Sequence, residues 1–162
     1  MASSKKSKLT HLNQRGEMHM VDIGQKQVTS RQAVAQSRLR LNKASIEALK
    51  NGADKGDVFA AARLAGIMAA KKTSELIPLC HPLGLTRVDV EVELKPPHVE
   101  ILVVAENAGK TGVEMEAMTA ASIAALTVYD MLKAVDRGMT IERVRLIKKT
   151  GGKSGEWKRR GR

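Results

Sequence analysis

The stretch TRVDVEVELK, residues 86–95, decides the fold class, because Thr86 and four apolar residues alternate with charged residues along it. This alternation has the period of a β-strand and predicts one buried face and one wet face. Pro96 and Pro97 then predict a turn, and residues 98–105 are predicted to return as a second strand, followed by a loop at residues 107–111. The stretch therefore predicts an antiparallel hairpin.

Further extended segments are predicted on either side of this hairpin. Residues 31–41 alternate approximately, residues 18–23 are also predicted to be extended, and residues 142–147 form the last predicted strand. Asn42 is a suitable N-cap for a short helix over residues 43–50.

Two longer segments have the spacing of helices. Residues 57–76 and 113–135 contain no proline, and each places alanines on one face. Pro78 and Pro82 bracket the turn that follows the first of them. Helices that alternate with strands in this order predict an α+β fold, a ferredoxin-like antiparallel sheet with helices packed on one face.

The length of 162 residues and the 43% hydrophobic content predict one compact domain. We place it at residues 9–157, between flexible basic tails at residues 1–8 and 158–162. The formal net charge is +11, of which residues 1–8 carry +3 and residues 148–162 carry +6. Most of the excess charge therefore lies at the two ends, where solubilising tails are an alternative to nucleic-acid binding.

The cellular location is predicted from features that the sequence lacks. No apolar run is long enough to span a bilayer, and residues 1–8 lack the apolar part of a secretory signal. Cys80 is the only cysteine, so no intrachain disulfide and no cysteine cluster for a metal is expected. We therefore expect a cytoplasmic protein that does not associate with membranes.

Two glycine-flanked lysines, Lys110 and Lys153, resemble parts of a phosphate-binding loop. Neither belongs to a Walker A motif, because the required earlier glycine is replaced by Val104 in one case and by Ile147 in the other. Lysines on such backbone can still approach a polyphosphate closely. An ordinary glycine turn is the alternative interpretation.

His81 and Lys55 are candidate functional residues in loops. His81 lies between Cys80 and Pro82 in a stiff turn, where its ring could donate to a phosphate or a purine-like edge. The four histidines show no metal-ligand spacing, so no metal site is predicted. Lys55 precedes the expected start of a helix, which suits anion binding or proton transfer, although a solvated loop lysine is the commoner case.

The long helix predicted over residues 113–135 carries an acid and a base on one face. Asp130 and Lys133 are three residues apart, as proton-transfer partners should be, and a surface ion pair is the alternative. Glu116 projects near the same face but lies about 21 Å away along the axis, at 1.5 Å per residue. Either Glu116 is structural, or a site combines opposite halves of this helix from two subunits.

Four segments together resemble the cyclic pyranopterin monophosphate synthase family, also described as molybdenum cofactor biosynthesis protein C. They occur in family order from about Leu9 to Trp157, and LIPLCHPL and TGVEMEAMTAAS are the most specific parts. The full segments are HLNQRGEMHMVDIG, KGDVFAAARLAGIMAAKKTSELIPLCHPLGL, GKTGVEMEAMTAASIAALTVYDMLKAV and VRLIKKTGGKSG.

The resemblance implies a specific reaction and assembly. The family is a phosphorus–oxygen lyase that converts 3′,8-cyclo-7,8-dihydro-GTP to cyclic pyranopterin monophosphate and releases diphosphate. It implies a homohexamer, a trimer of dimers, with active sites at subunit interfaces. It implies that no cofactor is required, and it leaves room for a divalent metal bound through the substrate phosphates.

The resemblance also assigns roles by motif position. It implies catalytic roles for Asp130, Lys133 and Lys55. It implies substrate binding by Leu79, Cys80, His81, Glu114, Met115 and Glu116, and triphosphate or diphosphate contacts by Arg31, Lys71, Lys149 and Lys153.

Two other functions remain as alternatives. A ferredoxin-like sheet with basic tails could bind RNA, but we expect no strand to carry the exposed aromatic rings on which bases stack, so nucleic-acid binding is not favoured. A regulatory nucleotide-binding subunit would share the phosphate contacts and show no turnover.

Overall fold

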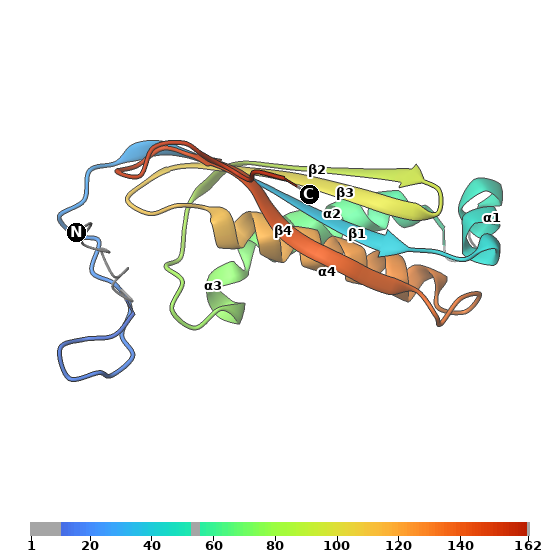
Figure 1. Ribbon diagram of the computed structural model, residues 1–162, viewed down its shortest axis with the longest axis horizontal. Coiled ribbons are helices and arrows are strands. Elements are labelled where there is room, and N and C mark those ends of the chain that lie inside the picture. Colours follow the sequence, from blue (N-terminus) through green and yellow to red (C-terminus); the bar gives the residue numbers. More distant parts are fainter. Residues whose placement is uncertain (1–10, 53–55, 162) are drawn as a thin grey trace, which may run out of the picture.

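The computed structural model describes residues 11–52 and 56–161 and has a sheet on one side and helices on the other (Figure 1). The sheet is antiparallel throughout, with strand order β2-β3-β1-β4-β5. The elements are β1 (Thr29–Arg40), α1 (Lys43–Asn51), α2 (Val58–Lys71), α3 (Thr73–Leu76), β2 (Leu85–Lys95), β3 (His98–Gly109), α4 (Glu114–Leu132), β4 (Thr140–Thr150) and β5 (Trp157–Lys158).

The predicted hairpin is confirmed as β2 and β3. Val90 and Val92 of β2 are buried, while Asp89, Glu91 and Glu93 are exposed, as the alternation predicts. Thr86 is exposed, contrary to the prediction, because the pairing with β3 is irregular at the start of β2. Strand β3 continues to Gly109, so the prediction that residues 107–111 form a loop is wrong for its first part. The reason is that β1 pairs with the whole of β3, from Arg40 opposite His98 to Thr29 opposite Gly109.

The predicted fold class is confirmed. Strand β1 is followed by helices that lead to β2, and β3 is followed by α4 that leads to β4, with β1 and β3 at the centre of the sheet. Helices α2 and α4 cover the same face (Figure 1), and the core lies between them and the sheet. This is the ferredoxin-like arrangement.

Local capping explains where the helices begin. The side chain of Asn42 accepts from the backbone N–H of Ser45 in a capping box at the start of α1. Asp57 caps α2 by accepting from the N–H groups of Phe59 and Ala60. The segment predicted as one helix to Leu76 is divided, because the backbone at Lys72 separates α2 from α3.

Small residues let α2 and α4 pack closely. A Cβ added at Gly66 of α2 would lie 3.2 Å from the carbonyl oxygen of Ala120 in α4. Five alanines of α4 are fully buried: Ala117, Ala120, Ala121, Ala124 and Ala125. This close packing fixes both ends of α4 relative to the sheet.

Two other predictions need correction, and one strand was not predicted. Residues 18–23 form no strand in the structure and show only an isolated bridge between Leu12 and Met18. Strand β4 is longer than residues 142–147, because it pairs with β1 along most of that strand. Strand β5 was not predicted, and it pairs with β4. The division of the chain into a domain and two tails stays a prediction.

The expectation that no strand carries an exposed aromatic ring is wrong at one position. Trp157 lies in β5, at the sheet edge, and is 41% exposed. The guanidinium of Arg159 lies 5.8 Å from the centre of its ring. One ring at an edge, already stacked on an arginine, is not a platform for two or three bases.

No helix within the described ranges has both the length and the hydropathy that a bilayer crossing requires.

Candidate active site

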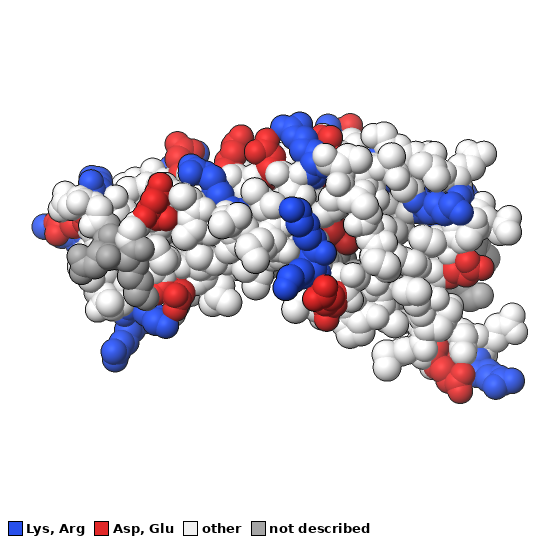
Figure 2. Space-filling view, turned by 180° about the vertical axis from the view of Figure 1, so that it is seen from behind, with Lys and Arg blue, Asp and Glu red and all other residues white. Residues whose placement is uncertain are grey.

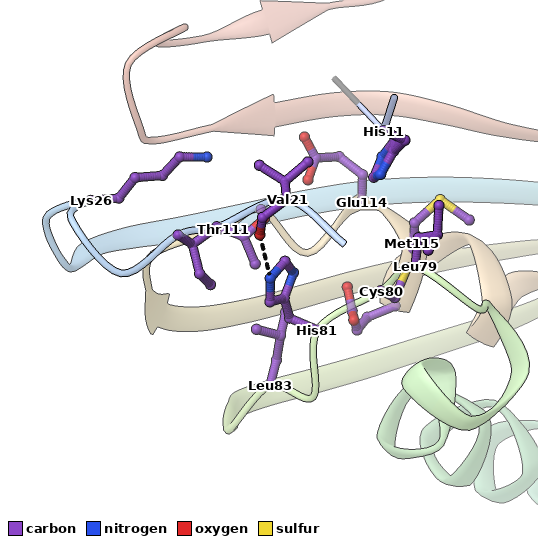
Figure 3. Close-up of a pocket in the computed structure, with 13 residues that line it drawn as sticks. His11, Val21, Lys26, Leu79, Cys80, His81, Leu83, Thr111, Glu114 and Met115 are labelled. Atoms are coloured by element: carbon purple, nitrogen blue, oxygen red, sulfur yellow. Dashed lines mark hydrogen bonds between the residues drawn. The ribbon is translucent and has the colours of Figure 1, made fainter. Parts of the chain in front are cut away.

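A first cavity, here called the head cavity, lies at the N-terminal end of α4 and has a volume of about 340 Å³. It is formed where the loop before β2 meets the start of α4 and the chain before β1 (Figure 3). Its lining residues are His11, Val21, Ile23, Lys26, Leu79, Cys80, His81, Leu83, Thr111, Gly112, Glu114, Met115 and Glu116.

His81 ties the chain before β1 to the head cavity. Its Nε2 lies 2.8 Å from the carbonyl oxygen of Val21, and Figure 3 shows the ring pointing at that carbonyl. Because a carbonyl oxygen can only accept, Nε2 carries the hydrogen and donates it. Nδ1 of a neutral ring is then the acceptor. The stiff turn predicted around His81 thus holds an imidazole of defined tautomer.

Two acidic groups shape the electrostatics of the head cavity. Glu116 is only 4% exposed, and burial raises its pKa, an effect that the charge of Glu114 reinforces. Burial likewise raises the pKa of the Cys80 thiol, with a smaller contribution from Glu116. Cys80 is therefore a neutral thiol at neutral pH, suited to packing and weak hydrogen bonding rather than nucleophilic attack.

A second cavity, here called the cation cavity, adjoins the first and has a volume of about 860 Å³. The two cavities share Lys26, Thr111, Gly112 and Glu114. The full lining is Lys26, Gln27, Thr29, Arg31, Lys110, Thr111, Gly112, Glu114, Lys149, Gly152, Lys153 and Ser154. Five of these side chains are cationic, which makes the cavity suited to a polyanion.

Two glycines let the loop after β4 close over Arg31. Gly151 and Gly152 have φ values of 90° and 69°, where residues with a side chain are strained. A Cβ at Gly152 would lie 2.0 Å from a guanidinium nitrogen of Arg31, and one at Gly151 would lie 2.1 Å from the carbonyl oxygen of Ser30. The glycines of this loop are therefore needed for Arg31 and Lys153 to line the same cavity.

Among the described residues, Lys149 is the one cation of this cavity that forms an ion pair. Lys149 donates to the hydroxyl of Ser154 at 2.6 Å and lies 3.4 Å from a carboxylate oxygen of Glu114. Lys110 donates to the carbonyl oxygen of Gly24 at 2.6 Å. Glu114 is the one acidic residue of the lining. An incoming polyanion would therefore meet a clear excess of positive charge.

The structure brings most of the predicted substrate-binding residues together. Six of them line the head cavity, and the cation cavity contains three of the four predicted phosphate contacts: Arg31, Lys149 and Lys153. Lys71, the fourth, is exposed at the end of α2 and lines neither cavity.

Two of the three predicted catalytic residues, Asp130 and Lys133, line neither cavity. Lys133 follows the last residue of α4, and its Nζ lies 2.6 Å from Oδ1 of Asp130, so the two form the pair that their spacing predicts. Both side chains are more than half exposed. Asp130 is separated from Glu116 by about 21 Å along the helix axis and Lys133 by about 25 Å, at 1.5 Å per residue. Lys55 lies outside the described residues.

Sequence reasoning missed the contribution of the chain before β1. His11, Val21, Ile23 and Lys26 line the cavities, although no role had been assigned to any of them. The segment HLNQRGEMHMVDIG was part of the family resemblance, which was the available signal. Lys110 was noted only as a glycine-flanked lysine, and its place in the cation cavity agrees with that interpretation.

Comparison with known proteins now decides the family. Residues 20–152 match the model of the MoaC family. The chain belongs to the MoaC family. It is also 56% identical, over 156 residues, to a cyclic pyranopterin monophosphate synthase of Thermomicrobium roseum, with 94% of each chain covered. Both cavities of this MoaC family member are built mainly from residues inside the matched range.

Proposed function

We propose that both cavities form the substrate site of a cyclic pyranopterin monophosphate synthase that acts in molybdenum cofactor biosynthesis. The reaction converts 3′,8-cyclo-7,8-dihydro-GTP to cyclic pyranopterin monophosphate and releases diphosphate. The observation that best supports this function is the arrangement of the two cavities. A small cavity with hydrogen-bonding groups lies beside a larger cavity lined by five cations. A nucleotide-derived ring system with a triphosphate has these two parts.

The head cavity is proposed to bind the ring system. His81 offers Nδ1 as an acceptor while Nε2 is held by Val21, and Glu116 offers a buried carboxyl group of raised pKa. Leu79 and Met115 supply apolar walls. Groups that can accept and donate protons near the ring suit a rearrangement that opens and rebuilds it.

The cation cavity is proposed to bind the triphosphate. Arg31, Lys149 and Lys153, with Lys26 and Lys110 beside them, would stabilise the negative charge that develops as diphosphate leaves. Lys71 remains a proposed phosphate contact that would have to act from another subunit, because it lies outside this cavity.

Catalysis is proposed to need a second subunit. Asp130 and Lys133 lie at the opposite end of α4 from Glu116, so one small substrate cannot reach both ends within one chain. We propose that these two residues and Lys55 complete the site of a neighbouring subunit in a homohexamer, a trimer of dimers. Exposed apolar side chains on both helices support an assembly, because Leu64, Met68 and Leu126 are each more than half exposed.

No cofactor is proposed to be required. The described residues contain no group of three or more histidine, cysteine, aspartate or glutamate side chains placed to hold a metal ion. A divalent ion that takes part in turnover is therefore proposed to be held by the substrate phosphates. A cytoplasmic location belongs to the same proposal and is supported by the single, unpaired Cys80.

The direct test is turnover by the purified protein with the cyclised dihydro-GTP as substrate. We expect stoichiometric release of diphosphate and formation of the cyclic phosphate, without a protein partner. Arg31→Gln should lower kcat/KM, because it removes a proposed contact to the phosphates and to the charge that develops as diphosphate leaves. Substrate binding without diphosphate release would instead support the regulatory subunit, and salt-resistant RNA binding with sequence preference would support the RNA-binding alternative.

A further inference from the structure

The turn that follows α4 contains a buried carboxylate that has no part in either cavity. Asp136 is only 6% exposed and lines neither the head cavity nor the cation cavity. Acidic side chains are rarely buried, and those that are buried have hydrogen-bond donors around their oxygens. The partners of Asp136 therefore indicate what this end of the fold requires of it.

The carboxylate of Asp136 joins two segments that are distant in the sequence. Its Oδ1 accepts from the backbone N–H of Gly138 at 2.9 Å, within the turn itself. Its Oδ2 accepts from the backbone N–H of Asn42 at 3.1 Å and lies 3.0 Å from the hydroxyl of Ser45, which can donate to it. Asn42 and Ser45 form the capping box of α1. The turn after α4 is thus attached to the start of α1, at one end of the molecule (Figure 1).

The end of α4 needs such an attachment because it lacks a local stop signal. Helices commonly end on a glycine in the left-handed conformation, which satisfies the last carbonyl groups. Lys133, at the C-cap of α4, instead has right-handed helical backbone angles. Gly138, the first glycine after the helix, does not have a positive φ. The sequence after α4 therefore provides no glycine cap.

The turn itself holds the last carbonyl groups of α4. The carbonyl oxygen of Leu132 accepts from the backbone N–H groups of Val135 and Asp136. The hydroxyl of Tyr129 donates to the carbonyl oxygen of Arg137 at 3.0 Å. The last turn of the helix is therefore held by the residues that the carboxylate of Asp136 anchors.

The pair formed by Asp130 and Lys133 lies on this last turn. Lys133 Nζ lies 2.6 Å from Oδ1 of Asp130, and both side chains are more than half exposed. An exposed ion pair contributes little to stability, so this pair cannot by itself hold the helix end in place. The position of the pair follows from the backbone of the helix end, and the backbone is fixed through Asp136.

We propose that Asp136 is a positioning residue for the reaction, which fixes the end of α4 so that Asp130 and Lys133 keep the geometry that catalysis requires. This role rests on the proposed function, in which these two residues act on the substrate. Asp136 itself is buried and does not touch the substrate. Misplacement of a catalytic group by about 1 Å can lower a rate by about a hundredfold, so a loosened helix end is enough to remove most of the activity.

The expected effect of Asp136 is local rather than a change in the electric field of the whole protein. Loss of one carboxylate changes a formal net charge of +11 by one unit. Figure 2 shows acidic and basic side chains interspersed over one face of the molecule, without a large field of one sign. The capture of an anionic substrate should therefore stay nearly the same in an Asp136 variant.

The first test separates kcat from KM. Asp136→Ala should lower kcat about ten- to a hundredfold and change KM less than about twofold, because the cavities proposed to bind the substrate lie at the other end of α4. Asp136→Asn should give an intermediate kcat, because its amide has one oxygen where the carboxylate uses two. Glu47→Gln removes an exposed carboxylate from α1 and should leave both parameters unchanged.

A variant matched for loss of stability separates positioning from folding. Ser37 is fully buried, and its hydroxyl donates to the carbonyl oxygen of Ala121 in the middle of α4 at 2.8 Å. Ser37→Ala should therefore lower the free energy of unfolding and leave kcat unchanged. Urea unfolding compares the stabilities, and circular dichroism confirms that each variant is folded under the conditions of the activity assay.

The second test observes the helix end without turnover. Hydrogen–deuterium exchange with mass spectrometry should show exchange at least about tenfold faster in Asp136→Ala for peptides that cover the last turn of α4, because an anchor made of charged hydrogen bonds is lost. Peptides from the first turns of α4 should be unchanged, and Ser37→Ala should not show this pattern. If Asp136→Ala does not fold, Asp136→Asn is used in both tests.

The outcomes distinguish this role from the proposed function. Wild-type kcat in folded Asp136→Ala, in an enzyme that Lys133→Ala inactivates, would overturn the role of Asp136 alone. A fall in kcat that Ser37→Ala reproduces at equal loss of stability, or unchanged exchange at the end of α4, would also overturn it. Full activity of Lys133→Ala would overturn the proposed catalytic role of the pair and, with it, the role of Asp136.

Discussion

A mixing experiment tests whether one site uses opposite ends of α4 from two subunits. Glu116→Gln should remove the buried carboxyl group of the head cavity and keep its shape, whereas Lys133→Ala should remove the ion pair at the far end of the helix. The two positions are about 25 Å apart along the axis, at 1.5 Å per residue. Each variant alone should be nearly inactive, because each damages one half of every site.

The expected recovery on mixing follows from counting. In an equal, random mixture, a site is intact when its Glu116 half comes from the Lys133→Ala chain and its Lys133 half comes from the Glu116→Gln chain. This combination occurs in about a quarter of the sites, so activity should approach roughly a quarter of the wild-type value if the sites act independently.

The assay is diphosphate release after the two variants have been dissociated together and reassembled. Subunit exchange is checked by native mass spectrometry, and each variant taken through the same treatment alone is the control. A mixture that has exchanged subunits but stays as inactive as its parents would refute the shared site. Substantial activity of either single variant would refute the role of that residue.

Three further predictions concern the loop after β4, the buried carboxyl group and the N-terminal residues. Gly152→Ala should raise KM about tenfold, because its Cβ would displace the guanidinium of Arg31 and weaken the proposed contact of Arg31 with the substrate phosphates. The control is Gly155→Ala, which has a similar positive φ but open space around the added Cβ and should leave KM unchanged. Burial in the native state raises the pKa of Glu116 above its ordinary value of 4.5. The protonated carboxyl group therefore favours the folded state at acidic pH, and this stabilisation is lost as pH rises and the carboxyl group ionises. Urea unfolding should therefore show Glu116→Gln gaining stability relative to wild type between pH 4 and 7, and a constant difference would contradict this. Deletion of residues 1–8 should leave turnover intact, and a large loss of activity in a folded truncation would contradict this.

Much of the fold could be predicted because its signals are local. The alternation along β2 and the N-caps at Asn42 and Asp57 each act within a few residues, and the structure has the elements that they indicate. Strand ends could not be predicted, because β3 and β4 extend as far as β1 offers backbone partners from distant parts of the chain. The short strand β5 likewise exists only because it pairs with β4.

The candidate site divides in the same way. The sequence by itself determined the residue types and motifs, such as the stiff turn around His81 and the glycine-flanked lysines, because these depend on local backbone chemistry. Tertiary structure decided which of them meet. The chain before β1 reaches the head cavity through the hydrogen bond from His81 to Val21, and Gly152 brings Lys153 to Arg31. Asp130 stays far from Glu116, because both lie on α4 and a helix of that length cannot bring its two ends together.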